Sequence, residues 1–332
     1  MHKDILSVTV KKLLTSPKGI LAIDESIETC NKRFEKLNIP TTVENRRAYR
    51  ELLVTAPEIE KYVSGFIIFD ETFWQKSVNG KLFTEILKGK GIEPGIKVDI
   101  GAKDFALHPG EKITEGLDGL RDRLKHYRTA GASFAKWRAV ITISDKTPTD
   151  ANLIANADAL SRYAALCQEN DIVPIVEPEV LMDGSHDIDR CYEVTAHNLD
   201  ILFRELKSLD VWIPGLILKT NMIVSGKDAS VQATDEEVAT MTLKCLKEHV
   251  PADIGGIVFL SGGQDDEAST RHLHIMHTMG TLPWQLTFSY GRAIQNEALN
   301  HFAKQPEDIL GAQTKLIERC RANSLASVGK YV

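Results

Sequence analysis

The sequence predicts an α/β protein folded as a (β/α)8 TIM barrel, with one domain over residues 1–332 and extra helices at both ends. Three observations carry this prediction. Short apolar runs recur along the whole chain, helix-length segments separate them, and no Pro/Gly/Ser-rich linker divides the sequence. Eight such alternations favour a closed barrel, because parallel strands joined by helices must be covered on both faces.

Eight apolar runs are the expected strands. Most are uniformly apolar rather than alternating, which is typical of parallel strands that are buried on both faces. They cover residues 19–24, 65–69, 95–98, 134–140, 172–177, 215–219, 255–260 and 285–289.

The segments between these runs carry helix signals. Thr41-x-x-Glu44 and Thr234-x-x-Glu237 are capping-box patterns before apolar-periodic stretches. Gly131 follows an expected helix at the C′ position, where glycine readily adopts the left-handed backbone conformation that ends a helix.

The two ends of the chain predict helices outside the regular alternation. Residues 1–14 form an amphipathic pattern, which we expect to close the bottom of the barrel. Residues 295–304 and 307–322 predict helices packed outside it. An open doubly wound sheet is the alternative. It would show a glycine-rich loop after the first strand, where this chain has Asp24-Glu-Ser-Ile-Glu-Thr.

Composition excludes several classes of function. The formal net charge is −6 with no long basic run, so nucleic-acid binding and membrane-surface binding have no electrostatic basis. No apolar run approaches the roughly 20 residues of a membrane span. The five cysteines are dispersed and form no C-x-x-C pair, which indicates reduced thiols and a cytoplasmic protein.

Charged and polar residues gather at the carboxyl ends of the expected strands, where barrel enzymes place their active sites. Burying a charge costs several kcal/mol unless it is compensated, so packing does not explain a set of this size. The set comprises Asp24, Lys97, Asp99, Lys136, Arg138, Glu177, Glu179, Lys219, Ser261, Gly262, Gly263, Ser289, Gly291 and Arg292.

Lys219 is the candidate nucleophile. Burial at a strand end favours its neutral amine, which can attack a carbonyl and form a Schiff base. Lys136 would supply a second cation nearby. Glu177 and Glu179 would move the protons of carbinolamine formation and dehydration, and Asp24 would orient or deprotonate a substrate hydroxyl.

The remaining residues predict two anion-binding ends. Ser261, Gly262, Gly263, Gly291 and Arg292 follow the seventh and eighth strands, the usual phosphate site of such barrels. A second group would hold another phosphate across the mouth: Lys97, Arg138 and Arg33. A basic pocket in an acidic protein fits a doubly phosphorylated small molecule.

The same residues lie in seven ordered motifs that closely resemble class I fructose-1,6-bisphosphate aldolases over residues 19–331. The motifs are Gly19-Ile-Leu-Ala-Ile-Asp-Glu-Ser26, Glu44-Asn-Arg-Arg-x-Tyr49, Gly95-Ile-Lys-Val-Asp99, Phe134-Ala-Lys-Trp-Arg138, Ile172-Val-Pro-Ile-Val-Glu-Pro-Glu179, Val258-Phe-Leu-Ser-Gly-Gly263 and Leu286-Thr-Phe-Ser-Tyr-Gly-Arg292. The resemblance implies reversible cleavage of fructose 1,6-bisphosphate to dihydroxyacetone phosphate and glyceraldehyde 3-phosphate, in glycolysis or gluconeogenesis. It also implies no metal, no cofactor and a homotetramer.

The resemblance also implies a role for each site residue. Lys219 would be the Schiff-base lysine and Glu177 the main acid/base, with Lys136, Asp24 and Glu179 as partners. The C1 phosphate would bind Ser261, Gly262, Gly291 and Arg292, with Gly263 and Ser289 beside them. The C6 phosphate would lie towards Lys97, Arg33 and Arg138.

Two departures from the family pattern change the expectations. Thr220 stands where the family usually has proline, which restores a backbone N–H beside Lys219. The sequence ends at Tyr331-Val332 without the family's flexible tyrosine-ended tail, so truncating the last residues is expected to slow this chain less than tailed relatives.

Three other functions remain as alternatives. His272, His274 and His277 cluster after the seventh strand and could serve a metal-dependent aldolase, although on a helix at most two of them share a face. A transaldolase-type barrel would also use a strand lysine but needs no second phosphate site. A scaffold without activity is the third alternative.

Overall fold

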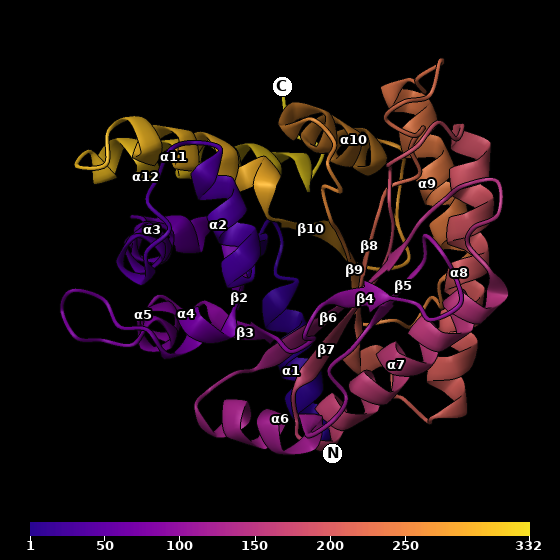
Figure 1. Ribbon diagram of the computed structural model, residues 1–332, viewed down its shortest axis with the longest axis horizontal. Coiled ribbons are helices and arrows are strands. Elements are labelled where there is room, and N and C mark those ends of the chain that lie inside the picture. Colours follow the sequence, from indigo (N-terminus) through magenta and orange to yellow (C-terminus); the bar gives the residue numbers. More distant parts are fainter.

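The computed structural model describes all residues 1–332, and eight parallel strands close a barrel in the order β1-β10-β9-β8-β7-β6-β3-β2 (Figure 1). The predicted (β/α)8 fold is therefore confirmed, and each predicted apolar run coincides with a barrel strand. The strands are β1 (Gly19–Ile23), β2 (Val63–Ile68), β3 (Glu93–Lys97), β6 (Phe134–Ile141), β7 (Val173–Val180), β8 (Ile217–Thr220), β9 (Gly256–Phe259) and β10 (Leu286–Tyr290).

Twelve α-helices accompany the strands, and α7, α8 and α9 lie together along one side of the barrel (Figure 1). None of the helices is both long and apolar enough to span a membrane. The helices are α1 (Lys3–Leu13), α2 (Ile27–Glu35), α3 (Val43–Thr55), α4 (Asp70–Trp74), α5 (Phe83–Gly89), α6 (Leu120–Thr129), α7 (Asp150–Glu169), α8 (Ile188–Ser208), α9 (Asp235–His249), α10 (Asp266–Thr278), α11 (Arg292–Lys304) and α12 (Ile309–Ala326).

The apolar core has two parts. A cluster of 75 buried residues fills the space between the barrel and its helices. A separate cluster of 12 fills the barrel interior at its amino-terminal end, where Leu6, Val10 and Leu13 of α1 meet inward-facing strand residues such as Phe134 and Ile217. Helix α1 thus closes the bottom of the barrel, as predicted from its amphipathic pattern.

One predicted helix start is wrong by a residue. Helix α3 is capped by Thr42, whose side chain accepts a hydrogen bond from the backbone N–H of Asn45, so Thr41 and Glu44 form no capping box. Thr41 and Thr42 are adjacent, and either side chain could cap the helix. The Thr-x-x-Glu pattern favoured Thr41, but Thr42 is the cap. The capping box of Thr234 and Glu237 at α9 is confirmed.

A two-stranded antiparallel ribbon was not predicted from the sequence. It consists of β4 (Ala102–Asp104) and β5 (Lys112–Thr114), and it follows β3 above the mouth of the barrel. All three residues of β4 are exposed, so the segment lacks the apolar run that identified the other strands. The ribbon brings Lys103 to the rim of the central cavity.

Candidate active site

The carboxyl ends of the strands enclose a cavity of about 1030 Å³, and almost every predicted site residue lines it. The residues come from all parts of the chain because the closed barrel brings its strand ends into one ring. Gly263 lies beside the cavity rather than in its wall. The predicted residues in the wall are Asp24, Arg33, Lys97, Asp99, Lys136, Arg138, Glu177, Glu179, Lys219, Ser261, Gly262, Ser289, Gly291 and Arg292.

A continuous chain of charged side chains crosses the floor of this cavity. Lys219 Nζ lies 3.0 Å from Glu177 Oε1, and Lys136 Nζ lies 3.1 Å from the other carboxylate oxygen, Oε2. On its opposite side Lys136 Nζ lies 2.8 Å from Asp24 Oδ2. Two ammonium groups and two carboxylates therefore alternate, and each charge has a partner of opposite sign.

Burial makes these contacts strong. Lys219, Lys136 and Glu177 are at most 4% exposed, so little water screens the charges. Burial alone would raise the pKa of Glu177, but Lys136, Lys219 and Arg138 lower it below its usual value. Burial likewise acts to raise the pKa of Asp24, and Lys136 and Lys219 instead lower it far below the usual range.

The pKa of Lys136 shifts in the opposite direction. Burial lowers the pKa of this ammonium, but the attraction of Asp24 and Glu177 outweighs burial and raises it well above its ordinary value. Lys136 therefore carries a permanent positive charge between the two carboxylates.

Glu179 and Arg138 form a second, partly buried ion pair beside the first chain. Their pairing follows from the strand register, since Val140 of β6 lies opposite Glu179 of β7 and Arg138 lies one inward position earlier. Burial lowers the pKa of Arg138, but Glu179 raises it well above its usual value. Glu179 holds Arg138 at the mouth, where 42% of the arginine side chain is exposed.

Lys97 and Arg33 stand at different sides of the cavity. Lys97 donates a hydrogen bond of 2.7 Å to the backbone oxygen of Asp99, on the same side as Arg138. Arg33 pairs with Glu25 and lies 3.4 Å from Asn296 of α11. The structure thus brings Arg33 close to the helix that starts with Arg292, and it does not group Arg33 with Lys97.

The turns after β9 and β10 form the expected anion-binding end. Gly262 and Gly263 have φ of +56° and +90°, which favours glycine in the turn. Gly291 is the N-cap of α11, and it lines the cavity together with Arg292, the first residue of that helix. The hydroxyl of Ser289 is buried and has no hydrogen-bond partner in the chain, which leaves it free for a ligand.

Several cavity residues were missed from the sequence. Ser26 caps α2 by accepting a hydrogen bond from the backbone N–H of Thr29, and the hydroxyl oxygens of the two residues lie 3.1 Å apart at the rim. Ser26 stands two residues after Asp24, so the rule that strand ends carry function could have found it. Lys32 and Lys36 also line the cavity, but their helix position gave no signal in the sequence.

The histidines after β9 do not come together as ligands. His272 is buried, with Nδ1 2.8 Å from Gln264 Oε1 and Nε2 2.9 Å from Asp235 Oδ1. His277 Nε2 instead lies 3.0 Å from the backbone oxygen of Leu286. No group of three or more His, Cys, Asp or Glu side chains could hold a metal ion. His272 is therefore a buried hydrogen-bonding residue.

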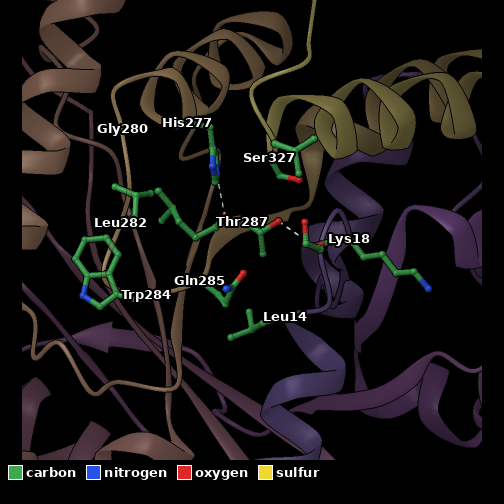
Figure 2. A pocket seen from close by; sticks show the side chains of 12 residues that line it. Leu14, Lys18, His277, Gly280, Leu282, Trp284, Gln285, Thr287 and Ser327 are labelled. Carbon is green, nitrogen blue, oxygen red and sulfur yellow. Dashed lines mark hydrogen bonds between the residues drawn. The ribbon is translucent and has the colours of Figure 1, made fainter.

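A smaller cavity of about 250 Å³ lies at the opposite end of β10 (Figure 2). His277, Trp284 and Thr287 line it, and the hydroxyl of Thr287 donates to the backbone oxygen of Lys18. It contains none of the predicted site residues, so the chemistry belongs to the large cavity.

The fold and the large cavity define a class of protein, the barrel enzymes that form a Schiff base with an anionic carbonyl substrate. Comparison with known proteins agrees with this class. Residues 5–332 match the family described as "Fructose-bisphosphate aldolase class-I". The chain belongs to the class I fructose-bisphosphate aldolase family, which confirms the predicted family and enzyme class, a carbon–carbon lyase.

Individual relatives match all or nearly all of the chain. A protein of Xanthomonas axonopodis pv. citri (strain 306), described as "Probable fructose-bisphosphate aldolase class 1", is 54% identical over 100% of this chain and 99% of its own length. "Fructose-bisphosphate aldolase 4, cytosolic" of Arabidopsis thaliana is 46% identical over 96% of this chain and 81% of its own length.

One solved structure is similar to this chain in both fold and sequence over nearly its whole length. Fructose-bisphosphate aldolase from Plasmodium falciparum, in complex with TRAP and a small-molecule inhibitor, has a TM-score of 0.97 and 43% sequence identity. The match covers 99% of this chain and 95% of that one.

Proposed function

We propose that this chain cleaves fructose 1,6-bisphosphate reversibly to dihydroxyacetone phosphate and glyceraldehyde 3-phosphate through a Schiff base on Lys219. The observation that carries the proposal is the buried contact of 3.0 Å between Lys219 Nζ and Glu177 Oε1. A carboxylate at this distance can take a proton from the ammonium and return it later to the substrate.

Proton transfer within this pair starts the reaction. Glu177 takes a proton from Lys219, and the neutral amine attacks the C2 carbonyl of the sugar to form a carbinolamine. Glu177 then gives the proton to the carbinolamine hydroxyl, which leaves as water and forms the iminium ion. Glu177 thus acts first as the base and then as the acid, and it already lies in contact with Lys219.

Asp24 serves the bond-breaking step. As the C3–C4 bond breaks, its electron pair moves into the iminium and forms an enamine, while Asp24 takes the proton of the C4 hydroxyl so that the aldehyde can leave. The low pKa of Asp24, which Lys136 and Lys219 maintain against the effect of burial, keeps this group ionised before the step. Lys136 stays charged throughout and stabilises both carboxylates.

The two ends of the cavity would hold the two phosphates. The turn with Ser261, Gly262 and Gly263 would bind the C1 phosphate together with Ser289, Gly291 and Arg292, because these groups supply hydroxyls, backbone N–H groups and a guanidinium. Lys97 and Arg138 would face the C6 phosphate. The position of Arg33 beside α11 supports a role nearer to Arg292 than the sequence suggested.

We further propose that residues 1–332 act as one domain in a cytoplasmic homotetramer. The burial of all five thiols is compatible with a reducing compartment, and a relative from Arabidopsis thaliana carries the word cytosolic in its name. Light scattering should give four times 36.9 kDa for the tetramer.

Borohydride trapping tests the central proposal. Incubation with fructose 1,6-bisphosphate in EDTA, followed by reduction and peptide mapping, should leave a stable adduct on Lys219. Lys219→Met should abolish both the adduct and cleavage while keeping the fold. The exposed Lys244 provides the control, since Lys244→Met should retain full activity. An adduct on another lysine, or cleavage that depends on metal, would overturn the assignment.

A further inference from the structure

Gln295 is a fully buried polar residue in the first turn of α11, three residues after Arg292. It faces the end of β1 rather than solvent, and it does not line the large cavity. A buried carboxamide is costly unless all of its groups are hydrogen-bonded, so its contacts indicate why the position is polar.

The amide nitrogen of Gln295 holds the segment that leads to Asp24. It donates to the backbone oxygen of Ala22 at 2.6 Å and to Glu25 Oε1 at 3.1 Å. These two acceptors lie on either side of Asp24 in the sequence. The ladder between β1 and β10 pairs Leu21 with Tyr290 as its last residues, so the side chain of Gln295 takes over where the strand hydrogen bonds end.

The amide oxygen of Gln295 is held from the other side. It accepts a hydrogen bond of 3.0 Å from the buried hydroxyl of Tyr49 and lies 3.4 Å from Arg33 Nη1. Glu25 is in turn fixed by Arg50, whose Nη2 lies 2.8 Å from Glu25 Oε2. Burial raises the pKa of Glu25, but Arg50 and Arg33 lower it, so the acceptor is a carboxylate.

The same side chain touches the phosphate turn. A Cβ added to Gly291 would lie 3.7 Å from Gln295 Nε2 and 3.2 Å from the backbone oxygen of Ala22. The turn that starts α11 and the end of β1 are thus packed against each other with Gln295 between them.

We propose that Gln295 is a positioning residue, which fixes the segment carrying Asp24 to the anion-binding turn at Gly291 and Arg292. The proposal rests on the aldolase function above, because it concerns the geometry of that reaction. By holding the end of β1 and the turn at Gly291 together, Gln295 would fix the distance from Asp24 to Lys136. It would also fix the distance from Asp24 to the bound C1 phosphate. Catalytic groups that are held within a fraction of an ångström react far faster than mobile ones.

The groups that face Asp24 determine what its displacement would change. They are Lys136 on β6, Lys219 on β8, Lys97 on β3 and Glu177 on β7. If Asp24 moves away from Lys136, it loses the contact that keeps it ionised against burial. The pKa of Asp24 then rises towards the range in which activity is measured, and we expect kcat to fall at a higher pH than in the wild type.

Gln295→Met tests the role, because methionine preserves the length of the side chain and removes both hydrogen-bonding groups. Gln313→Met is the matched control. Gln313 is also buried on a C-terminal helix, and its amide donates to the backbone oxygen of Leu52 at 2.9 Å, remote from the large cavity. Both variants should lower Tm by a few degrees, about the effect of losing a buried hydrogen bond.

Only Gln295→Met should change the kinetics. We expect kcat for fructose 1,6-bisphosphate to fall roughly tenfold with a smaller change in KM, and the acid limb of kcat to shift upward by about half a pH unit or more. Gln313→Met should keep the rates and pH profile of the wild type. Cleavage by the wild type and by this control tests the aldolase function separately from the role of Gln295.

Two results would overturn the proposal. One is a Gln295→Met variant whose Tm falls like that of the control while kcat and its pH profile remain those of the wild type. If Gln295→Met does not fold, Gln295→Glu keeps the shape and replaces the amide nitrogen that donates to Ala22. An unchanged acid limb in a folded Gln295→Glu variant would be the second contradicting result.

Discussion

Lys136 is the residue on which the charge balance of the active site depends. It lies between Asp24 and Glu177, and at 3% exposure it has almost no water to replace a lost partner. Removing one member of a buried ion pair leaves an uncompensated charge, which is far more costly than the loss of an exposed pair.

Lys136→Met is therefore expected to destabilise the fold by about 3 kcal/mol near pH 7. In the wild type the pKa of Asp24 and of Glu177 is lowered, so both carboxylates stabilise the fold above their unfolded-state pKa values, and that stability is lost only as pH falls through the lower folded-state values. The variant lacks the main attraction, so both pKa values rise. The difference in unfolding free energy should then shrink as pH falls towards 4.

Urea denaturation of both proteins between pH 4 and pH 8 measures this difference. Lys125→Met is a suitable control because Lys125 is an exposed residue of α6, 3.7 Å from Asp122, and its loss should not be measurable. A difference between wild type and Lys136→Met that stays constant across this range would show that the lysine contributes packing rather than charge.

At the scale of single elements, two substitutions at the start of α3 test whether Thr42, as in the structure, or Thr41, as the sequence pattern suggested, caps the helix. Thr42→Ala should cost about 1 kcal/mol because it leaves the N–H of Asn45 without its acceptor. Thr41→Ala should cost nearly nothing, since Thr41 contributes only its backbone oxygen to Arg46. Urea unfolding of the two variants measures both losses of stability. A larger loss for Thr41→Ala would show that Thr41 caps the helix after all.

The elements also show which signals a sequence contains. Strands such as β7 are buried along their whole length, and the apolar run over residues 172–176 marked this one in the sequence. The β4–β5 ribbon has three residues in each strand and an exposed first strand, so neither length nor burial distinguished it from a loop. The second strand is held in part by side chains of α7, since Asn152 and Asn156 donate to the backbone oxygen of Lys112, and no local pattern in the ribbon predicts these contacts.

At the scale of the whole molecule, stability and chemistry are located at opposite ends of the barrel. The interior core under the active site depends on α1, and Leu6 is fully buried there. Leu6→Ala should cost about 3 kcal/mol with little change in kcat at a temperature where the variant is folded. Val8→Ala on the exposed side of α1 should change stability by less than about 0.5 kcal/mol, since Val8 is 53% exposed. Equal losses in thermal unfolding would mean that α1 does not seal the barrel.

The catalytic floor was predictable because its residues follow strands, but its supports were not. Lys219, Glu177 and Asp24 each stand at a strand end, where the fold itself fixes their meeting point. Gln295 and Arg33 lie on helices, and their partners are 270 and 8 residues away in Glu25. Glu25 lies in the segment between β1 and α2, and no local sequence pattern specifies that helix residues will pair with it.

Closure of the barrel also affects how the protein behaves at high concentration. Every barrel strand has a neighbour on both sides, so the main sheet offers no unpaired strand to which another molecule could add. The ribbon β4–β5 does have open sides, but it is short and carries Lys103, Asp104 and Lys112. Short, charged edges discourage intermolecular β-pairing. An abundant enzyme with this architecture gains resistance to aggregation from the same ring of strands that brings its catalytic residues together.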